Sequence, residues 1–197
     1  LRCDDGTAFD TVVTEVLRDC IIVKILSEGK SQKNLPDITL YLALLKGGNF
    51  DFAIQKAVEI GVNKIVPLIT ERTVVPGNKI DSQKIARWNK IASEAAKQSL
   101  RPLLPEVSAV ERFANAIAND GSPYKVICHP GASIQMRDFF KSNARDKVSI
   151  LIGPEGGFSD GELKTAADYG WVALNLGLTH LRAETAAIVI PSLVIYE

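Results

Sequence analysis

The chain has 197 residues, of which 46% are hydrophobic, and its 23 basic and 23 acidic residues cancel to a formal net charge of zero. A chain of this length and composition can bury one substantial core and a small appendage. The neutral balance excludes bulk electrostatic attraction as the basis of nucleic-acid binding, so any such contact must come from a local patch.

Targeting and redox signals are weak in this sequence. No apolar run approaches 18 residues and no signal-peptide pattern opens the chain, so we expect neither a membrane span nor a signal peptide. The absence of an initiator Met predicts that an N-terminal portion is missing. Cys3, Cys20 and Cys128 are odd in number and unpatterned, which favours a reduced, cytoplasmic setting. With only two histidines we expect no metal cluster.

The first 27 residues alternate and are rich in Val, Ile and Thr. Residues 11–16 and 20–25 are predicted to form two antiparallel strands. The polar stretch from Ser27 to Asp37, which contains Gly, Asn and Pro, is then predicted to be a linker.

From Ile38 onward, predicted strands alternate with predicted helices, a pattern typical of an α/β fold with a parallel sheet. Residues 38–44 form the first of these strands. Apolar residues at i, i+3, i+4 and i+7 from Phe50 then predict a helix that Gly61 closes. Residues 62–69 form the next strand, which runs into Glu71 and Arg72.

A long amphipathic helix is predicted next, with Asp81 as its N-cap and an end near Leu100. Its packing side consists of Ile85, Trp88, Ala92, Ala95 and Ser99, and its charged side consists of Arg87, Lys90, Glu94, Lys97 and Arg101. A charged stripe is usually a solvated helix face. The alternative is a local basic patch, with Arg72 nearby in sequence, that contacts a phosphate backbone.

The next elements are a helix over residues 109–119, a strand over residues 125–130 and a helix over residues 133–141. The strand ends in His129-Pro130, so His129 is either a contact in a ligand-binding loop or a structural residue at a strand end.

A glycine-rich turn follows the buried strand 148–152, with the sequence Gly-Pro-Glu-Gly-Gly-Phe over residues 153–158. Ser159 and Glu162 have capping-box spacing, which predicts a helix start. No phosphate-loop or dinucleotide motif is present, and Glu155 would repel a phosphate. The loop therefore suits a polar, partly cationic ligand, unless it is only a tight turn with a surface Glu.

A second loop of the same design follows a strand that ends at Leu176-Gly177. A helix is predicted to begin near Glu184-Thr185, with Arg182 just ahead of it. This last helix is almost wholly apolar and must be buried, and Pro191 is expected to kink it. Both loops leave the carboxyl ends of strands, where open parallel sheets bind ligands.

The two loops together resemble the signature of the 16S rRNA uridine-N3 methyltransferase family, within the SPOUT class of trefoil-knotted RNA methyltransferases. The matching segments are residues 153–158, Leu176-Gly177 and residues 181–186 (Leu-Arg-Ala-Glu-Thr-Ala). Upstream segments in the family's order and rough spacing are Lys46-Gly47, Gln55-Lys56, Glu59-Ile-Gly-Val62, Pro67, Glu71-Arg72, Arg87-Trp88, Glu94-Ala95 and Gln98-Ser99-Leu-Arg101. The resemblance covers about residues 38–197. It departs at Thr179-His180, where the family usually has Arg-Ile.

This resemblance implies a fold, a cofactor and partners. It implies a SPOUT methyltransferase domain over residues 37–197, in which the last helix threads behind the preceding loops to form the trefoil knot. Residues 1–36 resemble part of a PUA-like β-barrel, with a linker. The implied cofactor is S-adenosylmethionine and the implied substrate is 16S rRNA or the small ribosomal subunit. The resemblance further implies a homodimer.

The resemblance, the two loops and the chemistry of methyl transfer together suggest roles for residues. Cofactor binding is assigned to His129, Pro130, Ile152, Gly153, Gly156, Gly157, Leu176, Gly177, Leu181, Glu184 and Thr185. Substrate binding is assigned to Lys46, Arg72, Arg87, Gln98 and Arg101. Arg182 and Glu155 are the catalytic candidates, Arg182 because its charge can stabilise a deprotonated uridine. The alternative for Arg182 is an ion pair with Glu184 or Glu155, and no residue is assigned as general base.

Two other classes of function stay open. The first is a nucleotide-binding α/β enzyme such as a kinase or Rossmann oxidoreductase, although its glycine loop should follow an early strand and not lie in the last quarter of the chain. The second is a noncatalytic or differently targeted knotted RNA-binding protein, which the departure at Thr179-His180 leaves possible.

Overall fold

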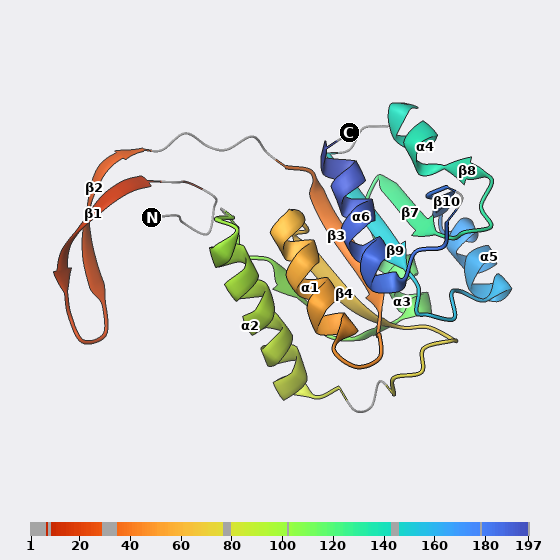
Figure 1. Ribbon diagram of the computed structural model, residues 1–197, viewed down its shortest axis with the longest axis horizontal. Coiled ribbons are helices and arrows are strands. Elements are labelled where there is room, and N and C mark those ends of the chain that lie inside the picture. Colours follow the sequence, from red (N-terminus) through yellow and green to blue (C-terminus); the bar gives the residue numbers. More distant parts are fainter. Residues whose placement is uncertain are drawn as a thin grey trace.

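The computed structural model consists of an α/β body and a separate N-terminal hairpin (Figure 1). It describes residues 7, 9–28, 35–76, 80–101, 103–142, 146–177 and 179–196. The strands are β1 (Phe9–Val16), β2 (Ile21–Glu28), β3 (Asp37–Ala43), β4 (Lys64–Ile69), β5 (Glu106–Val107), β6 (Glu111–Arg112), β7 (Tyr124–Cys128), β8 (Ile134–Gln135), β9 (Lys147–Ile152) and β10 (Val172–Asn175). The helices are α1 (Asn49–Ile60), α2 (Ser82–Gln98), α3 (Phe113–Asn119), α4 (Met136–Ser142), α5 (Asp160–Asp168) and α6 (Ala183–Tyr196).

The body is built on one parallel sheet, as the alternating pattern predicted. Its eight strands follow the order β5-β4-β3-β9-β7-β10-β8, and β6 also pairs with β4. Every pairing in this sheet is parallel. The central strands β3 and β9 are almost continuously apolar because helices cover both of their faces.

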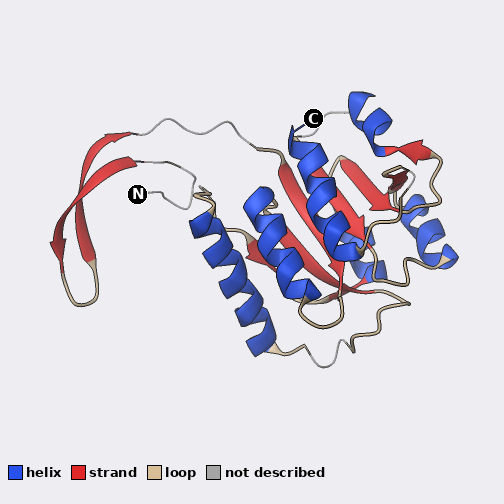
Figure 2. Cartoon of the chain, in the orientation of Figure 1, coloured by secondary structure: helices blue, strands red, loops and turns tan. Residues whose placement is uncertain are grey.

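The helices divide between the two faces of the sheet (Figure 2). Residues of α1, α2, α4 and α6 share one hydrophobic cluster with Leu40 and Leu42 of β3. Residues of α3 and α5 share the other cluster with Tyr41, which lies between those two leucines. This alternation follows from the two-residue period of a strand, which sends successive side chains to opposite faces.

Local sequence signals place the ends of α1 and α2. Asp81 caps α2 by accepting a hydrogen bond from the Lys84 amide at 2.8 Å, as predicted. Gly61 follows α1 with φ = 142°, a conformation that favours glycine. At the other end of α2 the left-handed position is occupied by Leu100, with φ = 56°.

Two predicted helices begin later than expected. The helix predicted from residue 109 begins at Phe113, because Glu111–Arg112 pair with β4 as the short strand β6. The helix predicted from residue 133 begins at Met136, because Ile134–Gln135 pair with β10 as β8. In both places the backbone forms two-residue ladders before it turns into the helix, so the predicted starts were wrong.

The N-terminal hairpin projects away from the body in Figure 1. Its two strands pair antiparallel, which confirms that prediction. Large apolar side chains such as Val16 and Ile21 are exposed along it. Residues 29–34 of the predicted linker 27–37 lie outside the described residues, and Cys3 lies outside them as well. The division into domains at residues 36 and 37 stays a prediction.

Helix α6 packs against α1 and contacts β3 and β9. Its buried residues include Ala187, Ile190 and Val194, and Pro191 lies inside the helix. In the portions of the chain that the structure describes, no helix combines the length and the apolar character needed to cross a membrane. The threading that would make a knot stays a prediction.

Candidate ligand cavity at the carboxyl edge of the sheet

A cavity of about 770 Å³ lies at the carboxyl ends of β7, β9 and β10. Three segments supply most of its wall: residues 128–131 after β7, the glycine loop (residues 152–158) after β9, and the residues that follow β10. The predicted site residues that line it are Arg72, His129, Pro130, Ile152, Gly153, Glu155, Gly156, Gly157, Leu176, Gly177, Leu181, Arg182 and Glu184. Those that do not line it are Lys46, Arg87, Gln98, Arg101 and Thr185. The structure therefore gathers most of the predicted residues at one edge.

The glycine loop has a tight, constrained backbone. Gly157 has φ = 69°, and its amide donates to the Pro154 carbonyl at 2.9 Å. Gly153 packs under the ring of Phe158, because a Cβ at position 153 would lie 3.1 Å from that ring. Phe158 is buried, and its ring packs against that of Phe113 of α3 at 5.7 Å between centroids. The glycines of the loop thus bring backbone groups to the cavity wall without a Cβ of their own to shield them.

The glycine loop also holds the loops that follow β3 and β4. A Glu155 carboxylate oxygen accepts a hydrogen bond from the Lys46 amide at 3.3 Å. An Arg72 guanidinium nitrogen donates to the Gly156 carbonyl at 3.0 Å. These two contacts join the loops after β3, β4 and β9 into one rim. Glu155 and Arg72 line the cavity, and backbone groups of neighbouring loops hold both side chains in position.

Glu162 performs two structural tasks at the start of α5. Its Oε2 accepts from the Ser159 amide at 2.9 Å, while the Ser159 hydroxyl accepts from the Glu162 amide, which confirms the predicted capping box. Its Oε1 accepts from the Glu71 amide at 2.8 Å. The cap of α5 therefore also anchors the loop after β4.

The wall after β7 is a turn that begins at His129. The His129 amide donates to the Leu174 carbonyl at 2.9 Å, and its carbonyl accepts from the Ala132 amide at 3.0 Å. The Asn175 side-chain amide in turn donates to the Ala132 carbonyl. A Cβ at Gly131 would lie only 2.8 Å from His129 Nε2, so any larger residue at position 131 would collide with the imidazole.

Sequence reasoning missed other residues of the cavity, including Asn49, Cys128 and Phe158. Burial raises the pKa of the Cys128 thiol to about 12, so the group is a neutral apolar wall and not a nucleophile. Phe158 belonged to the quoted motif without a role. The position of Cys128 at a strand end, directly before His129, was the one signal that could have found it.

The arginine loop (residues 179–182) carries one charged side chain, that of Arg182. Arg182 is exposed, and within the described residues its guanidinium forms neither a hydrogen bond nor an ion pair. The alternative ion pair with Glu184 or Glu155 is therefore not formed here. The Arg182 carbonyl accepts from the Ala186 amide at 2.8 Å, which ties this residue to the first turn of α6.

The predicted substrate-binding stripe on α2 is divided by its contacts. Arg87 pairs with Asp51 of α1 at 2.5 Å, and Gln98 lines a groove between α1 and α2 together with Arg87. Arg101 lies beyond the helix end and donates to the carbonyls of Val58, Gly61 and Val62. The guanidinium of Arg101 is thus turned into the fold at the end of α1.

Across the described parts of the chain, no three His, Cys, Asp or Glu residues are grouped so that they could hold a metal ion. The polar groups that face the cavity are instead carboxylates, guanidinium groups, imidazoles and backbone amides. A cavity of this size, mainly apolar with a few convergent polar groups, is typical of a site for a nucleoside-sized ligand.

Comparison with known proteins points in one direction. The family model described as "RNA methyltransferase domain" matches residues 31–195. Among curated proteins, the chain is 35% identical over 168 residues to ribosomal RNA small subunit methyltransferase E of Mesomycoplasma hyopneumoniae, covering 85% of this chain and 72% of that protein. It is also 35% identical over 173 residues to the protein of that name from Buchnera aphidicola subsp. Acyrthosiphon pisum, covering 85% and 68%.

Solved structures agree with these relatives. A putative methyltransferase from Legionella pneumophila, in complex with the bound cofactor SAM, superimposes with a TM-score of 0.83 at 33% identity, over 98% of this chain and 80% of that one. A ribosomal RNA small subunit methyltransferase E from Neisseria gonorrhoeae bound to S-adenosyl methionine gives a TM-score of 0.83 at 29% identity, over 96% and 78%.

Proposed function

Because this chain belongs to the RNA methyltransferase domain family, we propose that it transfers a methyl group from S-adenosylmethionine to N3 of a uridine in 16S rRNA. The observation that carries the proposal is the single cavity in which the glycine loop and the arginine loop meet. A kinase or Rossmann oxidoreductase is disfavoured, since the glycine loop follows β9, late in the chain, and holds the carboxylate of Glu155.

The residues of the cavity fit the proposed cofactor. Gly153, Gly157 and Gly177 present backbone groups that can hold an adenosine, and Gly157 and Gly177 have positive φ angles of 69° and 124°. The carboxylates of Glu155 and Glu184 suit a ligand that carries a sulfonium and an ammonium group. When bound, the cofactor supplies an electrophilic methyl group. Thr185 does not line the cavity, so we do not include it in the proposed binding set.

The proposed chemistry assigns Arg182 to the substrate. Uracil N3 carries a proton at neutral pH and becomes a good nucleophile only when that proton leaves. A charged hydrogen bond from a guanidinium is worth about 1.5–3 kcal/mol, which corresponds to a fall of roughly one to two units in the pKa of N3. The free guanidinium of Arg182 in the cavity can make this bond, and holding N3 in line with the methyl group supplies much of the remaining acceleration.

We place the rRNA on the face formed by α1 and α2, where Arg87, Lys90 and Gln98 line the groove between the helices. Arg72 and Lys46, whose loops are hydrogen-bonded to the glycine loop, are further proposed contacts of the rRNA. We further propose that the protein acts as a homodimer in the cytoplasm, and that residues 1–36 form part of a separate RNA-holding domain. Because rRNA binding would depend on local cations of a neutral chain, the affinity for rRNA should fall as the salt concentration rises.

The test is methyl transfer from labelled S-adenosylmethionine to small ribosomal subunits taken from a strain that lacks N3-methyluridine. N3 lies on the base-pairing edge of uracil, so transfer there should stop reverse transcription next to one uridine. Calorimetric titration with S-adenosylmethionine, with NADH and ATP as controls, checks the cofactor separately. Selective cofactor binding without transfer to any rRNA would favour the noncatalytic scaffold instead.

A further inference from the structure

Both histidines of the chain, His129 and His180, line the same cavity. This matters because one requirement of the proposed reaction is unmet: something must take the proton from uridine N3. The guanidinium of Arg182 cannot do so, because it is already protonated. An imidazole is the side chain whose ordinary protonation change falls near neutral pH, where a general base is most effective.

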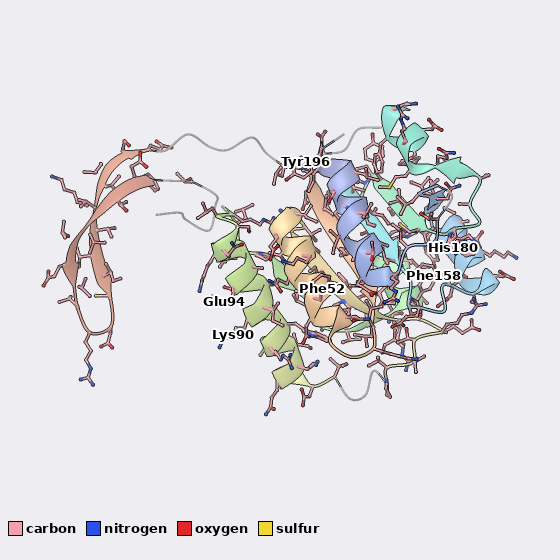
Figure 3. The ribbon with its side chains drawn as sticks, viewed as in Figure 1. Phe52, Lys90, Glu94, Phe158, His180 and Tyr196 are labelled. Carbon is pink, nitrogen blue, oxygen red and sulfur yellow. The ribbon has the colours of Figure 1, made fainter. Side chains whose placement is uncertain are left out.

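The two imidazoles are held in different ways. His129 belongs to the wall, since its ring packs over Gly131 and its backbone is bonded on both sides. His180 is exposed in the arginine loop, and no hydrogen bond or ion pair within the described residues occupies its ring. His180 and Phe158 of the glycine loop, both labelled in Figure 3, line the same cavity. Only His180 is both free and on the loop of Arg182.

We propose that His180 is the general base of this enzyme and acts together with Arg182, two residues later. The inference rests on the proposed function. The N3–H bond breaks and its proton passes to the His180 imidazole, while Arg182 stabilises the negative charge that develops on the uracil ring. The N3 electron pair then bonds to the methyl carbon as the carbon–sulfur bond breaks and its electron pair stays on sulfur. The imidazolium finally releases the proton to solvent.

Other groups of the cavity are less suitable as proton acceptors. The titratable and charged groups that line it besides His180 are Arg72, Cys128, His129, Glu155, Arg182 and Glu184. The Glu155 carboxylate accepts from the Lys46 amide, and the Cys128 thiol stays protonated because burial raises its pKa to about 12. Glu184, at the start of α6, is the competing acceptor, so it must be included in any test.

The test compares the pH dependence of kcat for the wild type with three variants, His180→Asn, His129→Asn and Glu184→Gln. The wild-type kcat should rise with pH over the range in which a histidine loses its proton. His180→Asn should lose this rise and lower kcat at pH 7 by roughly 10²–10⁴-fold, the usual contribution of a general base. Its affinity for S-adenosylmethionine in calorimetry should stay within a few fold. His129→Asn and Glu184→Gln should keep the rise, whatever they do to binding.

A modified substrate separates a base from a mere binding contact. Fluorine at C5 of uracil withdraws electrons and makes the N3 proton more acidic. On 16S rRNA transcribed with 5-fluorouridine, the deficit of His180→Asn should therefore shrink, whereas a lost contact would leave the deficit unchanged. A further readout needs no turnover: with S-adenosylhomocysteine bound, substrate RNA should shift the ring proton resonance of His180, which His180→Asn identifies among only two histidine signals.

The outcomes separate this inference from the proposed function. A wild-type enzyme that methylates uridine N3 while His180→Asn keeps its rate and pH profile overturns only the role of His180. Loss of the rise in Glu184→Gln, with His180→Asn unaffected, moves the role to Glu184. A wild type that transfers no methyl group to any rRNA uridine overturns both.

Discussion

Replacement of Arg101 by Met decides between the role that the sequence suggested and the one that the structure shows. The periodicity of α2 placed Arg101 on an RNA-binding stripe. In the structure its Nη1 donates to the carbonyls of Val58 and Val62, and its Nη2 donates to the Gly61 carbonyl at 2.9 Å. Arg101→Met keeps the apolar stem and removes every donor, so the carbonyls at the end of α1 lose their partner.

The expected loss of stability is about 3 kcal/mol. Hydrogen bonds to a charged group are worth about 1.5–3 kcal/mol each, but the three bonds share one guanidinium and are not additive. A cation at a helix C-terminus adds about 0.3–1 kcal/mol. Desolvation of the guanidinium offsets part of this stabilisation. Burial lowers the pKa of Arg101, and within the described residues its buried Nε has no hydrogen-bond partner.

The assay is urea unfolding, supported by thermal melting, where about 3 kcal/mol corresponds to a Tm lowered by roughly 6–12 °C in a chain of this size. The matched control is Lys90→Met, which removes one positive charge from an exposed position on α2 and should change stability by less than about 0.5 kcal/mol. If Arg101→Met unfolds like the wild type but loses rRNA affinity, the structural role is wrong and the RNA role stands.

Three further predictions concern other features of the fold. Leu100→Gly should raise the free energy of unfolding by about 0.5–1 kcal/mol in urea. The left-handed conformation of this exposed Leu costs about 1–2 kcal/mol, and the greater flexibility of glycine in the unfolded chain cancels about half of the gain. A loss of stability would mean that the Leu100 side chain packs. At pH 8, iodoacetamide should label the exposed Cys20 and spare Cys128, whose pKa burial raises to about 12, as mass spectrometry of the peptides would reveal; equal labelling would contradict this. Burial and the hydrogen bond to Asp120 raise the pKa of Tyr41, so above about pH 10 the unfolded state releases this proton first and stability falls by up to ~1.4 kcal/mol per pH unit. Tyr41→Phe should lose this component of the alkaline decline, and an unchanged slope would rule it out.

The parts of the fold that were predictable are those set by neighbouring residues. The capping box at Ser159, the N-cap at Asp81 and the alternation of strands with helices each depend on a short stretch of chain. The starts of α3 and α4 depend instead on two-residue ladders with β4 and β10, which lie far away in sequence. No local pattern records such a pairing, so these boundaries were missed.

Arg101 shows how a periodicity argument fails at a helix end. A spacing of three to four residues holds only while the chain stays helical, and α2 ends at Gln98. The amides of Leu100 and Arg101 donate back to the Lys97 and Ala96 carbonyls, a Schellman arrangement that turns the chain. The side chain that periodicity assigned to the outer face is therefore redirected toward α1.

The cavity illustrates a related distinction, between charged residues that build a site and those left free to act in it. Glu155, Glu162 and Arg72 each bind a backbone group of another loop, namely those of Lys46, Glu71 and Gly156. A sequence cannot reveal these contacts, because any residue supplies the backbone partner. Two of the predicted site residues, Glu155 and Arg72, thus assemble the rim together with the capping residue Glu162. Within the described chain, the charged side chains of the cavity that bind no other loop lie on or beside the arginine loop. We therefore expect substitutions there to lower the rate of methyl transfer without destabilising the fold, whereas substitutions on the rim should not separate the two effects.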